Sequence, residues 1–168
     1  MIFDNIKFKK QTGFSLLELL LYIGLASTIL LVTSSFFVLT VKSKVKNQTI
    51  AEVEQQGARV MQIINQKIHN ATVLTSPSQG SMASILNLNG GTTIFDLSNN
   101  TIRINEGTPI NLISDKVLVT NLSFHNLSYI NTPGIIRTQF TLVHVNSSGR
   151  NEYDYSQTFY GSANLRDN

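Results

Sequence analysis

The chain has 168 residues, a formal net charge of +3 at pH 7 and no cysteine. That length leaves room for one modest domain beside a membrane segment, and the lack of cysteine excludes a disulfide framework and thiolate chemistry. Residues 1–13 carry +2 of the charge and all other residues together only +1. We therefore expect no nucleic-acid contact.

Residues 1–13 form a short basic segment that ends in glycine. It contains Lys7, Lys9 and Lys10, and we interpret it as a leader peptide that takes no part in the fold. An ordinary secretory signal has an apolar core of about 7–15 residues, followed by a small-residue cleavage site. The apolar run here is about twice that length, so a cut at Gly13 would keep the run as an anchor. An uncleaved signal anchor is the alternative.

The long apolar run occupies residues 14–41 and contains a single ionisable side chain, Glu18. About 20 apolar residues are enough for a helix to cross a bilayer, so the sequence predicts a transmembrane helix over 14–41. An acid in hydrocarbon costs about 2–3 kcal/mol and usually has a partner. Glu18 is therefore a candidate functional residue, although an acid in a first helical turn also favours the helix dipole.

The block Gly13-Phe14-Ser15-Leu16-Leu17-Glu18 opens this run. With the upstream lysines and the unbroken apolar helix, it resembles the processing and methylation motif of type IV prepilins and pseudopilins. In that family a basic leader ends in Gly, Phe usually follows, and Glu is the fifth residue after the cut. The motif covers about the first quarter of the chain, and beyond it the similarity is one of architecture. Unlike many pilins, the chain lacks a C-terminal cysteine pair.

The resemblance implies a processing pathway and a set of partners. A prepilin peptidase would cut between Gly13 and Phe14, and Phe14 would be N-methylated. Glu18 would pair with the amino group of a neighbouring pilin or pseudopilin subunit. The protein would be single-pass in the inner or cytoplasmic membrane, among lipid, with a cytoplasmic N-terminus and an extracytoplasmic head, and would later enter a filament at the cell surface. Lysines flank the apolar run on both sides, so charge alone does not predict its orientation.

An amphipathic continuation of the helix is predicted over residues 42–75. Apolar or small residues recur every three or four positions, the spacing of one buried helix face. These are Ile50, Val53, Gly57, Val60, Ile64, Ile68 and Ala71. Polar residues such as Gln62 lie between them. No proline precedes Pro77, so we expect one continuous helix of about 55–60 residues that ends in the segment 75–78.

Residues 76–168 are predicted to form a β-rich globular head. From Ser81 the apolar pattern has a period of two, and segments rich in Gly and Asn interrupt it, as in an antiparallel meander. The predicted strands are 85–88, 92–97, 101–105, 117–120, 122–127, 135–145 and 153–160. The strand at 135–145 is the most apolar, so we expect it to be central. Residues 147–150 are predicted as the hairpin turn before the last strand.

These elements define the fold class as α+β. An amphipathic helix and a sheet with one apolar face can each bury that face against the other. We therefore expect a long N-terminal helix, first membrane-spanning and then amphipathic, packed on an antiparallel β-sheet head. The pilin resemblance implies the same architecture.

The sequence offers no constellation of residues for catalysis, a cofactor or a metal. His69, His125 and His144 fall on three different predicted elements without metal-ligand spacing, and no nucleophile motif is present. Glu152 and Asp154 would share one face of a strand, which leaves a calcium site as an alternative. We expect a protein that is not an enzyme and has no cofactor.

The function that these features favour is that of a structural minor pilin or pseudopilin. It would serve in a type IV pilus, a type II secretion system or a DNA-uptake (competence) filament, assembled through its N-terminal helix. The strand-rich head and the missing cysteine pair suit a minor subunit. The alternative is a non-polymerising, signal-anchored extracytoplasmic binding domain, which would have no need for the Gly-Phe junction and the Glu five positions on.

Overall fold

The computed structural model describes residues 13–130 and 134–166. The predicted leader, apart from Gly13, lies outside the described residues. The chain divides after Lys42 into two compact units, and each is considered by itself below. The first holds the apolar residues at the start of helix α1, and the second holds the remainder of α1 with all the strands.

Helix α1 extends over Leu16–Asn70, 55 residues, which confirms the prediction of one continuous helix. Up to Lys42 its side chains are exposed, and it is long and apolar enough to cross a membrane. Five hydroxyl side chains in this part donate hydrogen bonds to carbonyl oxygens three or four residues earlier: Ser27, Thr28, Thr33, Ser35 and Thr40. These hydroxyl groups are thereby satisfied within the helix, as a lipid environment requires.

The part of α1 in the second unit buries one face. Its buried positions are Thr49, Val53, Gly57, Val60, Ile64 and Ile68, which confirms the predicted stripe except at Ile50, which is half-buried. Ala71, directly after the helix, is also buried. Gln55, Arg59, Gln62 and Gln66, which lie between these positions, are exposed. The face therefore has the three-to-four residue spacing of an amphipathic helix packed on a core.

The predicted end of the helix near residue 75 is wrong, because α1 stops at Asn70. The backbone N–H groups of Thr72 and Val73 both donate to Oδ1 of Asn89, at 2.9 and 3.2 Å. The next residues form strand β1, Leu74–Ser76. The helix therefore ends at Asn70 because two contacts stabilise the following residues in another conformation. These are the hydrogen bonds to Asn89, seventeen positions after Thr72, and the pairing of β1 with a neighbouring strand.

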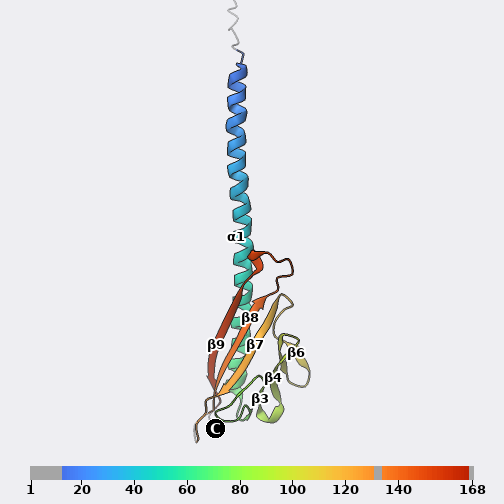
Figure 1. Cartoon of the computed structure of the whole chain (residues 1–168). Helices are drawn as coiled ribbons and strands as arrows, with labels where there is room; N and C mark the ends of the chain where they lie inside the picture. Colours follow the sequence, from blue (N-terminus) through green and yellow to red (C-terminus); the bar gives the residue numbers. More distant parts are fainter. Residues whose placement is uncertain (1–12, 131–133, 167–168) are drawn as a thin grey trace, which may run out of the picture. The chain divides into compact units, whose positions relative to one another are not determined.

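Nine strands follow among the described residues, and they form two antiparallel sheets where the sequence predicted one meander. The five-stranded sheet has the order β1-β3-β4-β5-β6, and the four-stranded sheet has the order β2-β7-β8-β9 (Figure 1). In the first sheet the remaining strands are β3 (Leu86–Leu88), β4 (Thr93–Ser98), β5 (Thr101–Asn105) and β6 (Pro109–Asn111). In the second they are β2 (Met82–Ala83), β7 (Val117–Asn126), β8 (Ile135–His144) and β9 (Ser156–Asn164).

The four-stranded sheet departs from the predicted strands at two places. The two strands expected around Thr120 are one strand, β7, whose register shifts between Val119 and Asn121; a bulge of this kind bends a strand without ending it. The connection after β8 contains a short 3-10 helix, Asn151–Tyr153, so β9 begins later than expected, at Ser156. Strand β8 lies between β7 and β9, which confirms it as central.

One hydrophobic core joins α1 to both sheets. Its largest fully buried side chains are Phe95, Phe124 and Phe140, with Ile64 and Ile68 of α1. The rings of Phe95 on β4 and Phe124 on β7 lie 6.4 Å apart and link the two sheets. The fold is therefore α+β, with the amphipathic part of α1 packed on antiparallel sheets.

The buried stripe predicts unequal effects of two alanine substitutions on α1. Ile64 is fully buried, so Ile64→Ala should lower the free energy of unfolding by roughly 2–5 kcal/mol. Gln62 is exposed, so Gln62→Ala should change it by less than about 0.5 kcal/mol. Denaturant unfolding of a truncated protein that begins at Ser43 measures both values. Equal losses of stability would contradict the assigned face.

Candidate functional site

The predicted cleavage junction lies directly before α1. Gly13, Phe14 and Ser15 precede the first helical residue, Leu16, and have no regular secondary structure. Nothing lies within 4 Å of the position that a Cβ atom on Gly13 would occupy, and the Phe14 side chain is 76% exposed. The peptide bond between Gly13 and Phe14 is thus in non-helical, exposed chain, the backbone state that a peptidase can bind.

Glu18 lies in the first turn of α1. It is four residues after Phe14 and four before Tyr22, so these three positions share one side of the helix. The rings of Phe14 and Tyr22 meet edge to face, with centroids 6.2 Å apart. Among the described residues, the Glu18 carboxylate has neither a hydrogen bond nor an ion pair. Within the part of the chain that the structure describes, the helix dipole remains to stabilise it, by about 0.3–1 kcal/mol.

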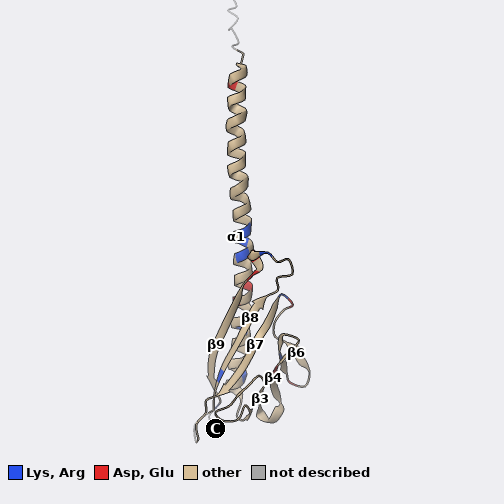
Figure 2. Ribbon diagram, in the orientation of Figure 1, with Lys and Arg blue, Asp and Glu red and all other residues tan. Residues whose placement is uncertain are grey.

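The apolar surface around Glu18 is large and uninterrupted. The bulky apolar side chains from Phe14 to Val41 are 43–83% exposed. Glu18 is the one acid in this part of α1, and Lys42, Lys44 and Lys46 follow it; Figure 2 shows the acidic position in red and the basic group in blue. A monomeric soluble domain rarely exposes a contiguous apolar patch larger than a few hundred Å². This surface therefore suits lipid or a bundle of other apolar helices.

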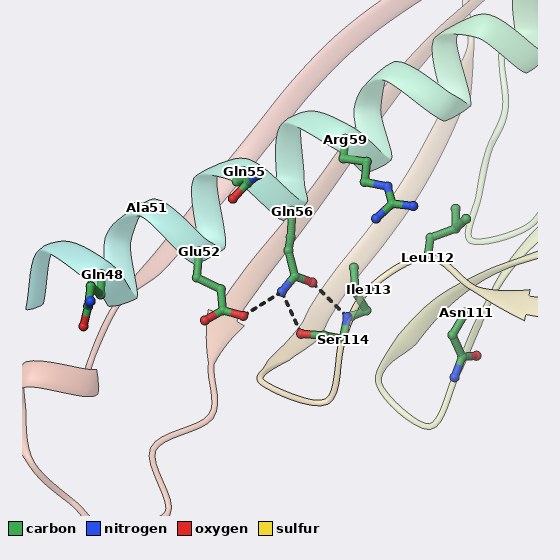
Figure 3. Close-up of a pocket in the computed structure, with 10 residues that line it drawn as sticks. All are labelled: Gln48, Ala51, Glu52, Gln55, Gln56, Arg59, Asn111, Leu112, Ile113 and Ser114. Carbon is green, nitrogen blue, oxygen red and sulfur yellow. Dashed lines mark hydrogen bonds between the residues drawn. The ribbon is translucent and has the colours of Figure 1, made fainter. Parts of the chain in front are cut away.

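An open groove lies beside α1 in the second unit. Six residues on successive turns of α1 line it from the helix side. The end of β6 and the segment that leads to β7 line it from the other side (Figure 3). The lining residues are Gln48, Ala51, Glu52, Gln55, Gln56, Arg59, Asn111, Leu112, Ile113 and Ser114, around a volume of about 640 Å³. Seven of the ten lining residues are polar or charged, so the groove has the character of a solvated surface.

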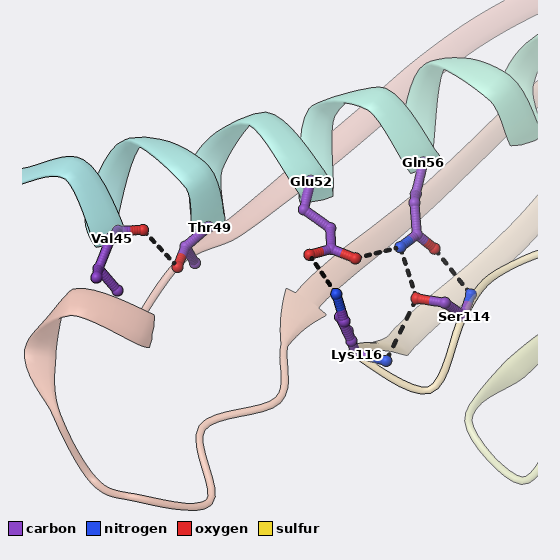
Figure 4. Close-up of polar contacts among 6 residues, drawn as sticks. All are labelled: Val45, Thr49, Glu52, Gln56, Ser114 and Lys116. Atoms are coloured by element: carbon purple, nitrogen blue, oxygen red, sulfur yellow. Dashed lines mark hydrogen bonds and ion pairs between the residues drawn. The ribbon is translucent and has the colours of Figure 1, made fainter.

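Hydrogen bonds at one end of the groove fix the segment before β7 to α1 (Figure 4). Gln56 donates to Oγ of Ser114 at 2.7 Å and accepts from the Ser114 backbone N–H at 2.8 Å. Glu52 accepts from Gln56 at 3.2 Å and forms an ion pair with Lys116 at 3.5 Å. The one acid in the groove is thus already engaged, and we assign this cluster a structural role.

Near Glu152 and Asp154, where calcium was the alternative, the positive charge comes from a lysine of the protein itself, Lys46. The Lys46 ammonium donates to the backbone carbonyl oxygens of Asn151 and Asp154, at 3.3 and 2.5 Å. Glu152 accepts from Arg150. Among residues 13–130 and 134–166, no three His, Cys, Asp or Glu side chains come together as a metal-binding group. The arrangement therefore gives the calcium alternative no support.

The three histidines remain on separate elements. His69 is exposed near the end of α1, His125 is half-buried on β7, and His144 on β8 stacks on Tyr153 with centroids 5.7 Å apart. Nδ1 of His144 is buried and has no hydrogen-bond partner in the described protein. The geometry assigns these side chains to packing and surface roles.

No protein-family model, curated protein or solved structure matches this chain.

An ion pair between the C-terminal end of α1 and the five-stranded sheet adds a pH-dependent contact. Lys67 and Glu106 meet at 2.6 Å, and Glu106 also accepts from the Thr93 hydroxyl at 3.0 Å. The bond from Lys67 holds the pKa of the Glu106 carboxyl below its ordinary value of 4.5, with a smaller contribution from Thr93. Because the folded-state pKa is depressed, the contact stabilises the fold above pH 4.5 and is lost as the pH falls through the lower, folded-state pKa.

The Glu106→Gln variant should accordingly be less stable than the wild type near pH 7, by at most about 1 kcal/mol, since both partners are partly exposed. The difference should shrink as the pH falls below 4.5, because the carboxylate protonates first in the unfolded chain and then, at a lower pH, in the folded protein. Denaturant unfolding of the protein beginning at Ser43, at pH 7 and at pH 3, measures it. Asp115→Asn serves as the control, since Asp115 is exposed and has no bonding partner in the described protein. A pH-independent difference would contradict the assignment.

Proposed function

We propose that this chain is a structural subunit, a minor pilin or pseudopilin, of a filament of the type IV pilus, type II secretion or competence class. The observation that carries the proposal is the Gly13-Phe14 junction with Glu18 five positions on, at the start of an exposed apolar helix. The α+β head with the amphipathic part of α1 in its core supports it. The protein would act by being inserted, trimmed and packed, without catalysis of its own.

Cleavage after Gly13 would create the group that Glu18 lacks. Hydrolysis of the Gly13–Phe14 bond leaves an ammonium on Phe14, and this ammonium is retained as a positive charge after N-methylation. The exposed, non-helical backbone at the junction supports access by a prepilin peptidase. The cut leaves residues 14–41 intact as the membrane anchor, whereas a conventional signal cleavage after the apolar core would remove them.

The unpaired carboxylate of Glu18 supports assembly through helix contacts. Glu18 has no partner in its own described chain, yet it belongs to an apolar segment suited to lipid. An ammonium from a neighbouring subunit would satisfy it, and breaking such a buried pair by deleting one partner costs about 3–5 kcal/mol. Because the pair forms only at one axial offset of two helices, it would also set the register between subunits.

The same features support a location. The anchor would be single-pass in the cytoplasmic membrane, with the N-terminus on the cytoplasmic side, where the prepilin peptidase acts, and the head outside. The exposed apolar side chains from Phe14 to Val41 would contact lipid first and other subunits after assembly. Partners would be the peptidase, other pilin or pseudopilin subunits and membrane lipid.

The mature N-terminus tests the processing step. We expect mass spectrometry of protein extracted from membranes to show a chain that begins with N-methylated Phe14, when a prepilin peptidase is present. Gly13→Trp, which places a bulky side chain at the cut, should leave the leader attached. A wild-type chain that still begins at Met1, or one cut after Ala26, would contradict the proposal.

The Glu18→Val variant tests assembly separately from insertion. The change removes a carboxylate from hydrocarbon, so membrane insertion and leader removal should continue. The neighbouring ammonium would lose its partner, and recovery of the subunit in sheared filaments, or the number of filaments per cell, should fall by roughly tenfold or more.

Ser34→Val is the matched control, because it also replaces a polar side chain of the apolar segment by valine. It should assemble normally. A non-polymerising anchored binding domain predicts no difference between the two variants, so normal assembly of Glu18→Val would favour that alternative.

A further inference from the structure

Strand β9 is a long, unprotected edge of the four-stranded sheet. It pairs with β8 along Ser156–Asn164, no other described strand lies beside it, and Figure 1 shows it at the outside of the sheet. Its pairing with β8 has no register shift, and its nine residues include neither a charged residue nor proline. Proteins normally protect such edges with charge, proline, a bulge or a very short strand, and β9 uses none of these.

The other edge strands of the described sheets are short. Strands β1 and β6, at the edges of the five-stranded sheet, have three residues each, and β2, at the other edge of the four-stranded sheet, has two. An edge of two or three residues offers too few backbone groups for an added strand. The nine-residue edge of β9 is therefore the exception among the described strands.

The register identifies which backbone groups of β9 face outward. The bonds from Leu165 N–H to Gly134 and from His144 N–H to Tyr155 show that odd-numbered residues of β9 bond to β8. The N–H and C=O groups of the even-numbered residues therefore point to the free edge. These residues are Ser156, Thr158, Tyr160, Ser162 and Asn164. None of these outward groups has a hydrogen-bond partner in the described protein, so the edge is a ready-made template for an extended chain.

A pocket beside this edge adds side-chain selectivity. It has a volume of about 450 Å³ and is lined by Leu127, Ile135, Arg137, Tyr160, Gly161 and Ser162. Arg137 is exposed and has no ion-pair or hydrogen-bond partner among the described residues. Tyr160 is 60% exposed. An unpaired guanidinium that shares a pocket with an exposed aromatic residue is complementary to a carboxylate.

The two faces of β9 specify the rest of such a ligand. Odd-numbered residues face α1: Phe159 lies against Gly57, and Gly161 lies against Met61. Even-numbered residues face the polar side of the sheet, where Thr158 bonds Thr141 across the strands at 2.9 Å. An added strand would continue both surfaces, with apolar side chains on the α1 side and polar side chains, including the carboxylate, on the other.

We propose that β9 is a docking edge for an extended segment of a partner polypeptide, added by β-augmentation, with one acidic side chain reaching Arg137. The main chain of the partner would bond the even-numbered residues of β9, and the pocket would select its carboxylate. This inference concerns the head alone and stands independently of the filament proposal.

The probe that tests it is a fluorescent, end-capped nonapeptide, Thr-Val-Thr-Val-Glu-Val-Thr-Val-Thr. Its valines would lie on the α1 side and its threonines and glutamate on the polar side. We expect saturable binding to the full chain in detergent, measured by fluorescence anisotropy. Two matched peptides would be N-methylated, one at its odd-numbered residues and one at its even-numbered residues. In an added strand one of these sets of N–H groups faces β9 and the other faces solvent. One methylated peptide should therefore bind and the other should not.

Protein variants locate the site. Ser162→Pro removes an outward N–H and leaves the β8 ladder in place, so it should weaken binding by about tenfold or more. Arg137→Gln should weaken it by about threefold, and the peptide with Gln in place of Glu should lose affinity for the wild type by the same factor. Arg59→Gln is the matched control, because Arg59 is also exposed and unpaired in the described protein but lies on α1; it should bind normally.

Several results would overturn the proposal. They are no binding of the probe to the wild type, equal binding of the two methylated peptides, and an equal loss for Arg59→Gln and Arg137→Gln. If the wild type self-associates, Ser162→Pro abolishes this self-association and the probe does not bind, the edge would be assigned to a second copy of this chain. That result would also overturn the proposal of a separate partner.

Discussion

The head depends on one constraint, the burial of a single face of α1. Val53, Val60, Ile64 and Ile68 are fully buried in a core that also contains side chains from both sheets. Close approach is part of this packing, because a Cβ atom on Gly57 would lie 2.0 Å from Cζ of Phe159. Without this face neither sheet could exclude water from its inner side, and the strands beyond it would have nothing to pack on.

Polar contacts then fix the details that hydrophobic burial leaves open. The Asn89 side chain accepts hydrogen bonds from the two backbone N–H groups of Thr72 and Val73, just after α1, and so determines where the helix ends. Gln56 holds the segment before β7 through both of its amide atoms. The Lys46 ammonium donates hydrogen bonds to the carbonyl oxygens of Asn151 and Asp154, before β9. Because apolar contacts are non-directional, such bonds decide among arrangements that bury similar apolar area.

Groups that lack partners among the described residues are the best indicators of function. Glu18 is an isolated acid on an apolar helix, and the outward backbone groups of β9 are an unsatisfied edge. Both are costly or hazardous for an isolated monomer. The first suits a cation on a neighbouring apolar helix, and the second suits an extended chain. In each case the chemistry of the missing partner follows from the exposed group.

The sequence by itself determined the long helix and the longer strands, because their signals are local. The apolar run, the stripe from Val53 to Ile68 and the alternation of β5 over Thr101–Asn105 depend on residues close in the chain. Only the tertiary structure decided the rest. Division into two sheets, the end of α1 at Asn70, the bulge that keeps β7 continuous, and the placing of Arg137 and Tyr160 in one pocket all depend on partners far away in sequence. Such contacts compete with one another only once the chain is folded, so local periodicity in the sequence does not predict which of them form.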